Sequence, residues 1–194
     1  SGLLLTMGET GGGKSFWLAK LFKEFMLEHK KKTGGIYTLE MSGEEYAKRS
    51  VSMYPDLAKC KDRLYISGHV RSIDEVVAEV STKRLDIVGI DFVDWIASEI
   101  SEAAYSYVYK RCVELGRILG ITVVLLAQPN REGVKYKKFL TKFDARWTGM
   151  AENSAWQFIA LQIANSLDID DDKYPTFDED HYYMINLKQR GGWP

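Results

Sequence analysis

Residues 8–15 read Gly8-Glu9-Thr10-Gly11-Gly12-Gly13-Lys14-Ser15, which matches the pattern G-x-x-x-x-G-K-[ST]. The loop follows an apolar run, Leu3–Met7, and precedes an amphipathic stretch, so we expect it between a strand and a helix. Backbone N–H groups of such a loop bind the α- and β-phosphates of a nucleotide, and the helix N-terminus favours the anion. Lys14 reaches the β- and γ-phosphates, and the Ser15 hydroxyl is a ligand for Mg²⁺. The motif therefore predicts ATP and Mg²⁺ as cofactors, against the alternative of a flexible glycine-rich turn.

The bulk composition limits the class of protein. The chain has 194 residues, 45% of them hydrophobic and 27% charged, which fits a single globular domain over residues 1–194. The net charge of −1 means that any nucleic-acid site must be local. Two cysteines are too few for a disulfide framework, and the absence of an 18-residue apolar run argues against a membrane span, so we expect a cytoplasmic protein. Because the chain starts at Ser1, almost on a strand, we expect a fragment of a longer protein.

Apolar runs alternate with helical patterns along the whole chain. This alternation predicts an α/β fold with a mostly parallel central β-sheet flanked by helices. The expected strands are Leu3–Met7, Ile36–Leu39, Leu64–Ile66, Asp86–Phe92, Thr122–Ala127, Trp156–Ile163 and Tyr182–Leu187. Two helices should pack through apolar stripes, one with Leu18, Leu21, Phe22 and Phe25, and the other with Tyr105, Val108, Cys112, Leu115 and Leu119.

Polar side chains stand where three of these strands end. Asp91 follows Ile87–Ile90, Glu40 follows Tyr37–Leu39, and Gln128 follows the strand Thr122–Ala127. The carboxyl ends of parallel strands share one edge of the sheet, where ligands bind in open α/β folds. Asp91 is placed to hold the Mg²⁺ side of the site, Glu40 to orient and deprotonate water, and Gln128 to contact the γ-phosphate. The alternatives are an ordinary turn cap for Asp91 or Glu40 and a strand-end amide without a special role for Gln128.

Two blocks of charge lie in the C-terminal half. Residues 131–146 have a net charge of +4 from six basic side chains against two acidic ones, and residues 168–180 have a net charge of −6. The acidic block is typical of a solvated surface loop. The basic block could meet nucleic-acid phosphates, the alternative being a solvated loop with its aromatic residues packed inward. Its candidate DNA-binding residues are Arg131, Lys135, Lys137, Lys138 and Lys142.

Six blocks in order resemble the RecA-like motor domain of DnaB-type hexameric replicative DNA helicases. They are residues 8–15, Leu39-Glu40-Met41-Ser42, Ile90-Asp91, Leu126-Ala127-Gln128-Pro129-Asn130-Arg131, Asp144-Ala145-Arg146-Trp147-Thr148-Gly149 and Lys188-Gln189-Arg190-Gly191-Gly192. The resemblance covers essentially the whole chain. The chain departs from the family at Asn153–Trp156, where an acidic pair is usual, and at Glu99 and Glu102, where the loop is acidic instead of basic.

The resemblance implies a RecA-like P-loop NTPase core that hydrolyses ATP at subunit interfaces, moves on single-stranded DNA and unwinds duplex during replication. It implies that Glu40 is the catalytic glutamate, Asp91 the Walker B aspartate and Gln128 the phosphate sensor. Lys188 and Arg190 match residues that the family inserts into the neighbouring subunit's ATP site. The implied partners are single-stranded DNA, further copies in a hexameric ring, and a primase or helicase loader. The alternatives are a recombinase-like or clock-type ATPase of the RecA class, or a nucleotide-binding scaffold without helicase activity.

Overall fold

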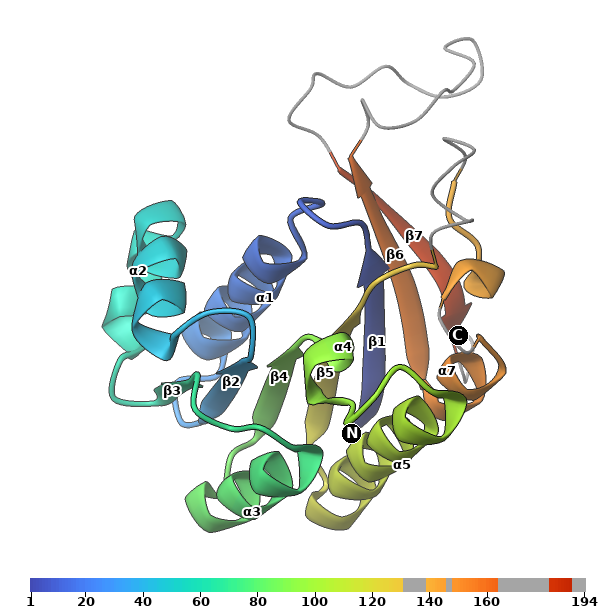
Figure 1. Cartoon of the computed structure of the whole chain (residues 1–194). Coiled ribbons are helices and arrows are strands. Elements are labelled where there is room, and N and C mark those ends of the chain that lie inside the picture. Colours follow the sequence, from blue (N-terminus) through green and yellow to red (C-terminus); the bar gives the residue numbers. More distant parts are fainter. Residues whose placement is uncertain (131–138, 146–147, 164–181, 190–194) are drawn as a thin grey trace, which may run out of the picture.

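The computed structural model describes residues 1–130, 139–145, 148–163 and 182–189, which form one sheet with helices on both faces (Figure 1). The sheet order is β3-β2-β4-β5-β1-β6-β7, and every neighbouring pair is parallel except β6 and β7. The strands are β1 (Gly2–Gly8), β2 (Gly34–Thr38), β3 (Leu64–Ser67), β4 (Ile87–Asp91), β5 (Thr122–Ala127), β6 (Gln157–Ile163) and β7 (Tyr182–Gln189). The predicted α/β class with a mostly parallel sheet is confirmed.

Helices cover the sheet on each side. They are α1 (Lys14–Glu28), α2 (Gly43–Met53), α3 (Ile73–Lys83), α4 (Val93–Ile96), α5 (Glu102–Leu119) and α7 (Thr148–Ser154), with short 3₁₀ helices η1 (Pro55–Cys60) and η2 (Lys142–Asp144). Among the described helices, none is both long and apolar enough to cross a membrane.

The period-2 alternation of strand side chains divides the core into two halves. In β5, Val124 and Leu126 pack with α1 and α2, whereas Val123 and Leu125 pack with α3 and α5. All four side chains are buried, so the central strand is apolar on both faces, as a parallel strand between two helical layers must be.

The strand β2 begins two residues earlier than its sequence predicts. Gly34 and Gly35 look like a helix stop, yet both pair with β3 on one side and β4 on the other. A Cβ on Gly34 would lie 3.1 Å from the Phe22 ring, and one on Gly35 would lie 2.4 Å from Leu85 Cδ1. Pairing on two sides therefore overrides the local turn preference, and the glycines let α1 approach the sheet closely.

Two further predictions need correction. Leu39 and Glu40 lie just beyond β2, because the chain bends away after Leu39 N–H donates to Asp91 O at 2.9 Å. Leu119 does not join the buried stripe of α5: it is 39% exposed, since the helix ends there and Gly120 adopts a left-handed conformation (φ 69°) that turns the chain away.

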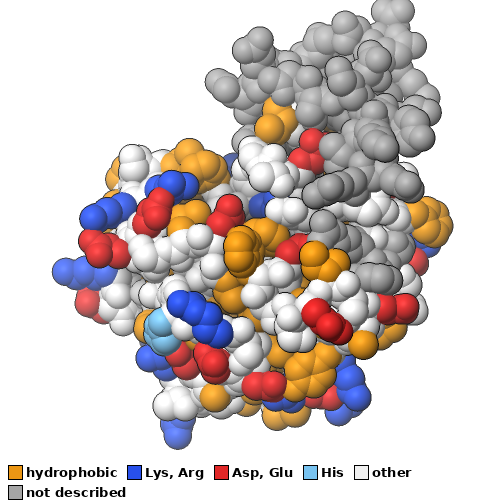
Figure 2. All heavy atoms as spheres, viewed as in Figure 1, with side chains coloured by type: hydrophobic (Ala, Val, Ile, Leu, Met, Phe, Trp, Pro, Cys, Tyr) orange, Lys and Arg blue, Asp and Glu red, His pale blue; other side chains and the backbone are white. Residues whose placement is uncertain are grey.

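Charged side chains of both signs are mixed over the described part of the face in Figure 2, in keeping with the small net charge. Of the candidate DNA-binding residues, the structure describes only Lys142. Arg131, Lys135, Lys137 and Lys138 lie outside the described residues, as does Arg190.

Close packing of α1 on β4 gives a stability prediction. A Cβ on Gly89 would stand 3.0 Å from both Leu18 Cδ atoms and from Phe22 Cε2, and these two side chains are fully buried. We expect Gly89→Ala to lower the free energy of unfolding by about 1–3 kcal/mol, since overpacked cores must shift. Urea denaturation measures the change. Gly149→Ala is the control, because nothing lies within 4 Å of that Cβ, and an equal loss in both variants would contradict the packing argument.

Candidate functional site

The loop between β1 and α1 is shaped by its glycines. Gly11 and Gly13 have φ values of 75° and 73°, in the left-handed region that favours glycine. The Gly12 N–H donates to Glu9 O at 2.9 Å, and a Cβ on Gly12 would lie 2.8 Å from that oxygen. Helix α1 starts directly after Gly13 with no side-chain cap. The first-turn N–H groups of a 15-residue helix thus face the loop, which is a favourable place for an anion.

Lys14 closes this loop from inside. Its ammonium group donates to Gly8 O at 2.8 Å and to Glu9 O at 2.7 Å, and the residue is only 7% exposed. Burial lowers the pKa of Lys14, and the negative charges of Asp91 and Glu40 oppose that shift. The side chain therefore lies as a desolvated cation beside the N-terminus of α1, where it can neutralise bound phosphate.

Asp91 is the buried anion of the site. It is 1% exposed, and neither carboxylate oxygen has a hydrogen-bond partner of good geometry among the described residues. Burial raises the pKa of Asp91 to about 6, while the Ser15 hydroxyl and Lys14 lower it. Because an unpaired buried carboxylate is costly, a cation beside it is strongly favoured. Ser15 and Asp91 thus fit the predicted Mg²⁺ ligands.

No group of three or more His, Cys, Asp or Glu side chains in the described ranges could hold a metal ion unaided. Mg²⁺ commonly binds through one or two protein oxygens together with phosphate oxygens and water. A site made of one carboxylate and one hydroxyl therefore suits a metal that arrives with a phosphate ligand.

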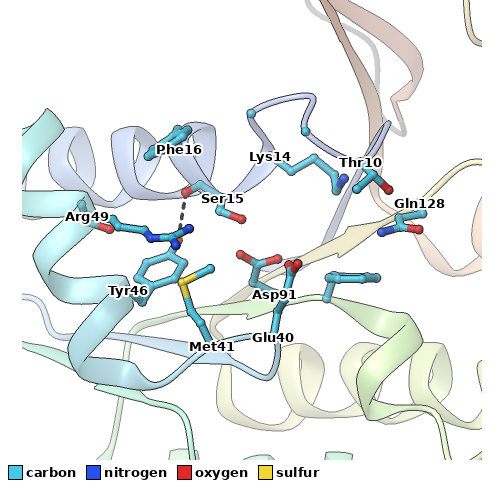
Figure 3. A pocket seen from close by; sticks show the side chains of 14 residues that line it. Thr10, Lys14, Ser15, Phe16, Glu40, Met41, Tyr46, Arg49, Asp91 and Gln128 are labelled. Carbon is cyan, nitrogen blue, oxygen red and sulfur yellow. Dashed lines mark hydrogen bonds between the residues drawn. The ribbon is translucent and has the colours of Figure 1, made fainter.

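These groups share one pocket at the carboxyl edge of the sheet (Figure 3). The predicted residues Glu40 and Gln128 both line it, and Glu40 lies beside Asp91 in the close-up view. From the loop, Thr10, Gly11, Gly13, Lys14 and Ser15 line the pocket. Gly8 and Glu9 act from behind through their carbonyl oxygens, which hold Lys14.

Sequence reasoning missed four side chains that also line the pocket: Phe16, Met41, Tyr46 and Arg49. Tyr46 is buried, and its hydroxyl donates to Ser15 O at 2.9 Å, which ties α2 to the start of α1. Arg49 follows Tyr46 by three residues, so both lie on one face of α2. The signal for them was the helix that Ser42 caps, since its N-terminus lies beside Glu40 and its inner face must meet the pocket.

Lys188 and Lys142 lie away from this pocket. Lys188 pairs with Phe158 near the start of β6, and its ammonium group donates to Glu152 O. Lys142 forms an ion pair with the Glu152 carboxylate at 2.9 Å. Within one chain, neither lysine is brought together with Lys14, Glu40 or Asp91.

Comparison with known proteins places this arrangement. No protein-family model matches the sequence, and no curated protein does. Among solved structures, the ATPase domain of a DnaB-type replicative helicase aligns with a TM-score of 0.77, covering 98% of this chain and 78% of its own, at 19% sequence identity. The chain has the fold of that ATPase domain. At this identity the likeness establishes the fold, so the RecA-like architecture expected from the motifs is confirmed.

The unpaired carboxylate makes a pH-dependent prediction. Because the pKa of Asp91 is raised in the folded state, its charge destabilises the fold above about pH 6, and the penalty disappears as the pH falls to the range where an unfolded aspartate is protonated. We expect Asp91→Asn to raise the free energy of unfolding by about 2–3 kcal/mol at pH 8 and by little at pH 4. Urea denaturation without nucleotide or metal, at both pH values, measures this. A variant that loses stability at pH 8 would contradict the assignment.

Proposed function

We propose that this chain is the motor domain of an ATP-dependent DNA helicase, which hydrolyses ATP between subunits and moves on single-stranded DNA. The observation that carries the proposal is the unpaired carboxylate of Asp91 beside Ser15 and Lys14, at the mouth of a glycine loop. The fold shared with the ATPase domain of a replicative helicase supports it, as do the ordered sequence blocks.

The chain's own residues supply most of the chemistry. The loop amides and Lys14 bind the phosphates and offset charge that develops on the transferred group. Mg²⁺ held by Ser15 and Asp91 neutralises charge between the β- and γ-phosphates when bound. Glu40 lies across the pocket from the loop and accepts a proton from the attacking water, while Gln128 hydrogen-bonds the γ-phosphate and reports its loss to the chain beyond β5.

Assembly completes the site in this proposal. Lys188 and Arg190 act on the ATP of a neighbouring copy, since a guanidinium group suits the charge that develops on phosphate oxygens. The placement of Lys188 beyond its own pocket is compatible with action in trans. We further propose a hexameric ring, with DNA phosphates met by the basic block that ends at Lys142, and a primase or loader as partner.

The hydrolytic roles are separable by mutation. We expect Lys14→Ala to abolish ATP binding, whereas Glu40→Gln keeps binding and lowers hydrolysis by about 100-fold or more, because it removes the base but not the phosphate contacts. Isothermal titration and phosphate release measure the two effects, with and without single-stranded DNA. Hydrolysis that rises with DNA and with protein concentration supports the helicase. Tight binding without hydrolysis at any concentration would indicate a scaffold, and filaments without unwinding a recombinase-like ATPase.

Mixing experiments test action in trans. Lys14→Ala and Lys188→Ala should each be inactive alone, yet an equimolar mixture restores an intact loop facing an intact Lys188 at about a quarter of the interfaces of a random ring. We expect DNA-stimulated hydrolysis to return toward that fraction. Lys110→Ala, an exposed lysine on α5, is the control and should stay active alone. If the mixture is as inactive as its components, the trans role is wrong.

A further inference from the structure

The pocket has two ends with different chemistry. The loop, Lys14 and Ser15 form the end that suits phosphate. The far end is bounded by side chains that carry no phosphate-binding backbone: Phe16, Met41, Tyr46 and Arg49. In Figure 3, Phe16 and Arg49 lie on the side of Ser15 away from Lys14. A ligand that fills the pocket must therefore present an anionic part to one end and a planar or apolar part to the other.

Phe16 is unusual for its position. It follows Ser15 in the first turn of α1 and is 37% exposed, whereas Leu18 and Ala19 in the same turn are fully buried. The ring therefore does not serve the core of the isolated chain. It lines the pocket instead, so its open surface is available to a planar group bound there.

The opposite wall comes from α2 and is held in place. Arg49 reaches the same end of the pocket, and its guanidinium group is paired with Glu45 one turn earlier. The Tyr46 hydroxyl fixes α2 to the backbone of Ser15, the residue that precedes Phe16. An aromatic ring and a guanidinium plane, both of which stack on flat π-systems, thus stand on two helices joined by a buried hydrogen bond.

We propose that this end of the pocket binds the base of a nucleoside triphosphate, with Phe16 stacked on the base and Arg49 beside it. The inference rests on the proposed nucleotide function and names what the far end recognises. Phe16 has no hydrogen-bonding group, and stacking tolerates any base because every base has a π-face. The site therefore distinguishes a nucleotide from bare polyphosphate, and it distinguishes purine triphosphates from one another only weakly.

The test compares ligands with and without a base. Isothermal titration of the whole chain with ATP and with inorganic tripolyphosphate, both with Mg²⁺, gives the two affinities. We expect Phe16→Ala to weaken ATP binding about tenfold, or about 1.4 kcal/mol, and to leave tripolyphosphate binding within about twofold. Phe16→Trp should restore ATP affinity because the π-face returns. Phe143→Ala, a 68% exposed phenylalanine on η2, is the matched control and should change neither affinity.

Each other outcome points to a different error. An equal loss of both ligands in Phe16→Ala would mean that the ring only shapes the loop, and an unchanged ATP affinity would mean that the base lies elsewhere; either overturns the stacking role. A wild-type chain that binds both ligands equally well overturns the base site but leaves the phosphate site standing. A wild-type chain that binds neither ligand overturns the proposed function itself.

Discussion

An unbalanced group of charges at the carboxyl edge of the sheet governs the rest of this structure. Lys14 and Asp91 are both buried, and Glu40 lies beside them, yet Lys14 is satisfied by the carbonyl oxygens of Gly8 and Glu9 and not by a carboxylate. Asp91 keeps two desolvated oxygens without hydrogen bonds to the described residues. Such an arrangement is costly for an empty site, so the fold is complementary to a ligand that brings a cation to Asp91 and anionic oxygens to Lys14.

The sheet must be rigid enough to hold that arrangement. Asp91 ends β4, which pairs on both sides with buried apolar strands. Glu40 is held by a different device: the N–H of the preceding residue donates to the backbone oxygen of Asp91 itself, so the two carboxylates are fixed through adjacent backbone. Tyr46 adds a third link, from α2 to Ser15. The site is thus supported by backbone hydrogen bonds and by one buried hydroxyl, each independent of a bound ligand.

Sequence reasoning found what local pattern encodes and missed what tertiary packing creates. The glycine loop, the apolar strand β5 and the polar residues at strand ends follow from the spacing of residues along the chain, and they are where the motifs placed them. Gly34 and Gly35 failed as a helix stop because pairing on two sides outweighs a local turn preference. Tyr46 and Phe16 left no signal, since an aromatic residue in a helix is usually core, and only the packing of α2 against α1 turns these two toward the pocket.

The antiparallel course of β7 gives the last residues of the described chain a constraint of their own. Lys188 pairs with Phe158, which pairs with Leu5, three residues or about 10 Å along the strand before the loop begins at Gly8. Its ammonium group is also engaged by the carbonyl oxygen of Glu152. If Lys188 serves a neighbouring copy, that charge-assisted hydrogen bond, worth about 1.5–3 kcal/mol, must be exchanged for a contact with phosphate. The exchange is favourable only where a neighbour presents a bound triphosphate. Under the trans proposal, subunit contact and nucleotide occupancy are therefore coupled through the same lysine.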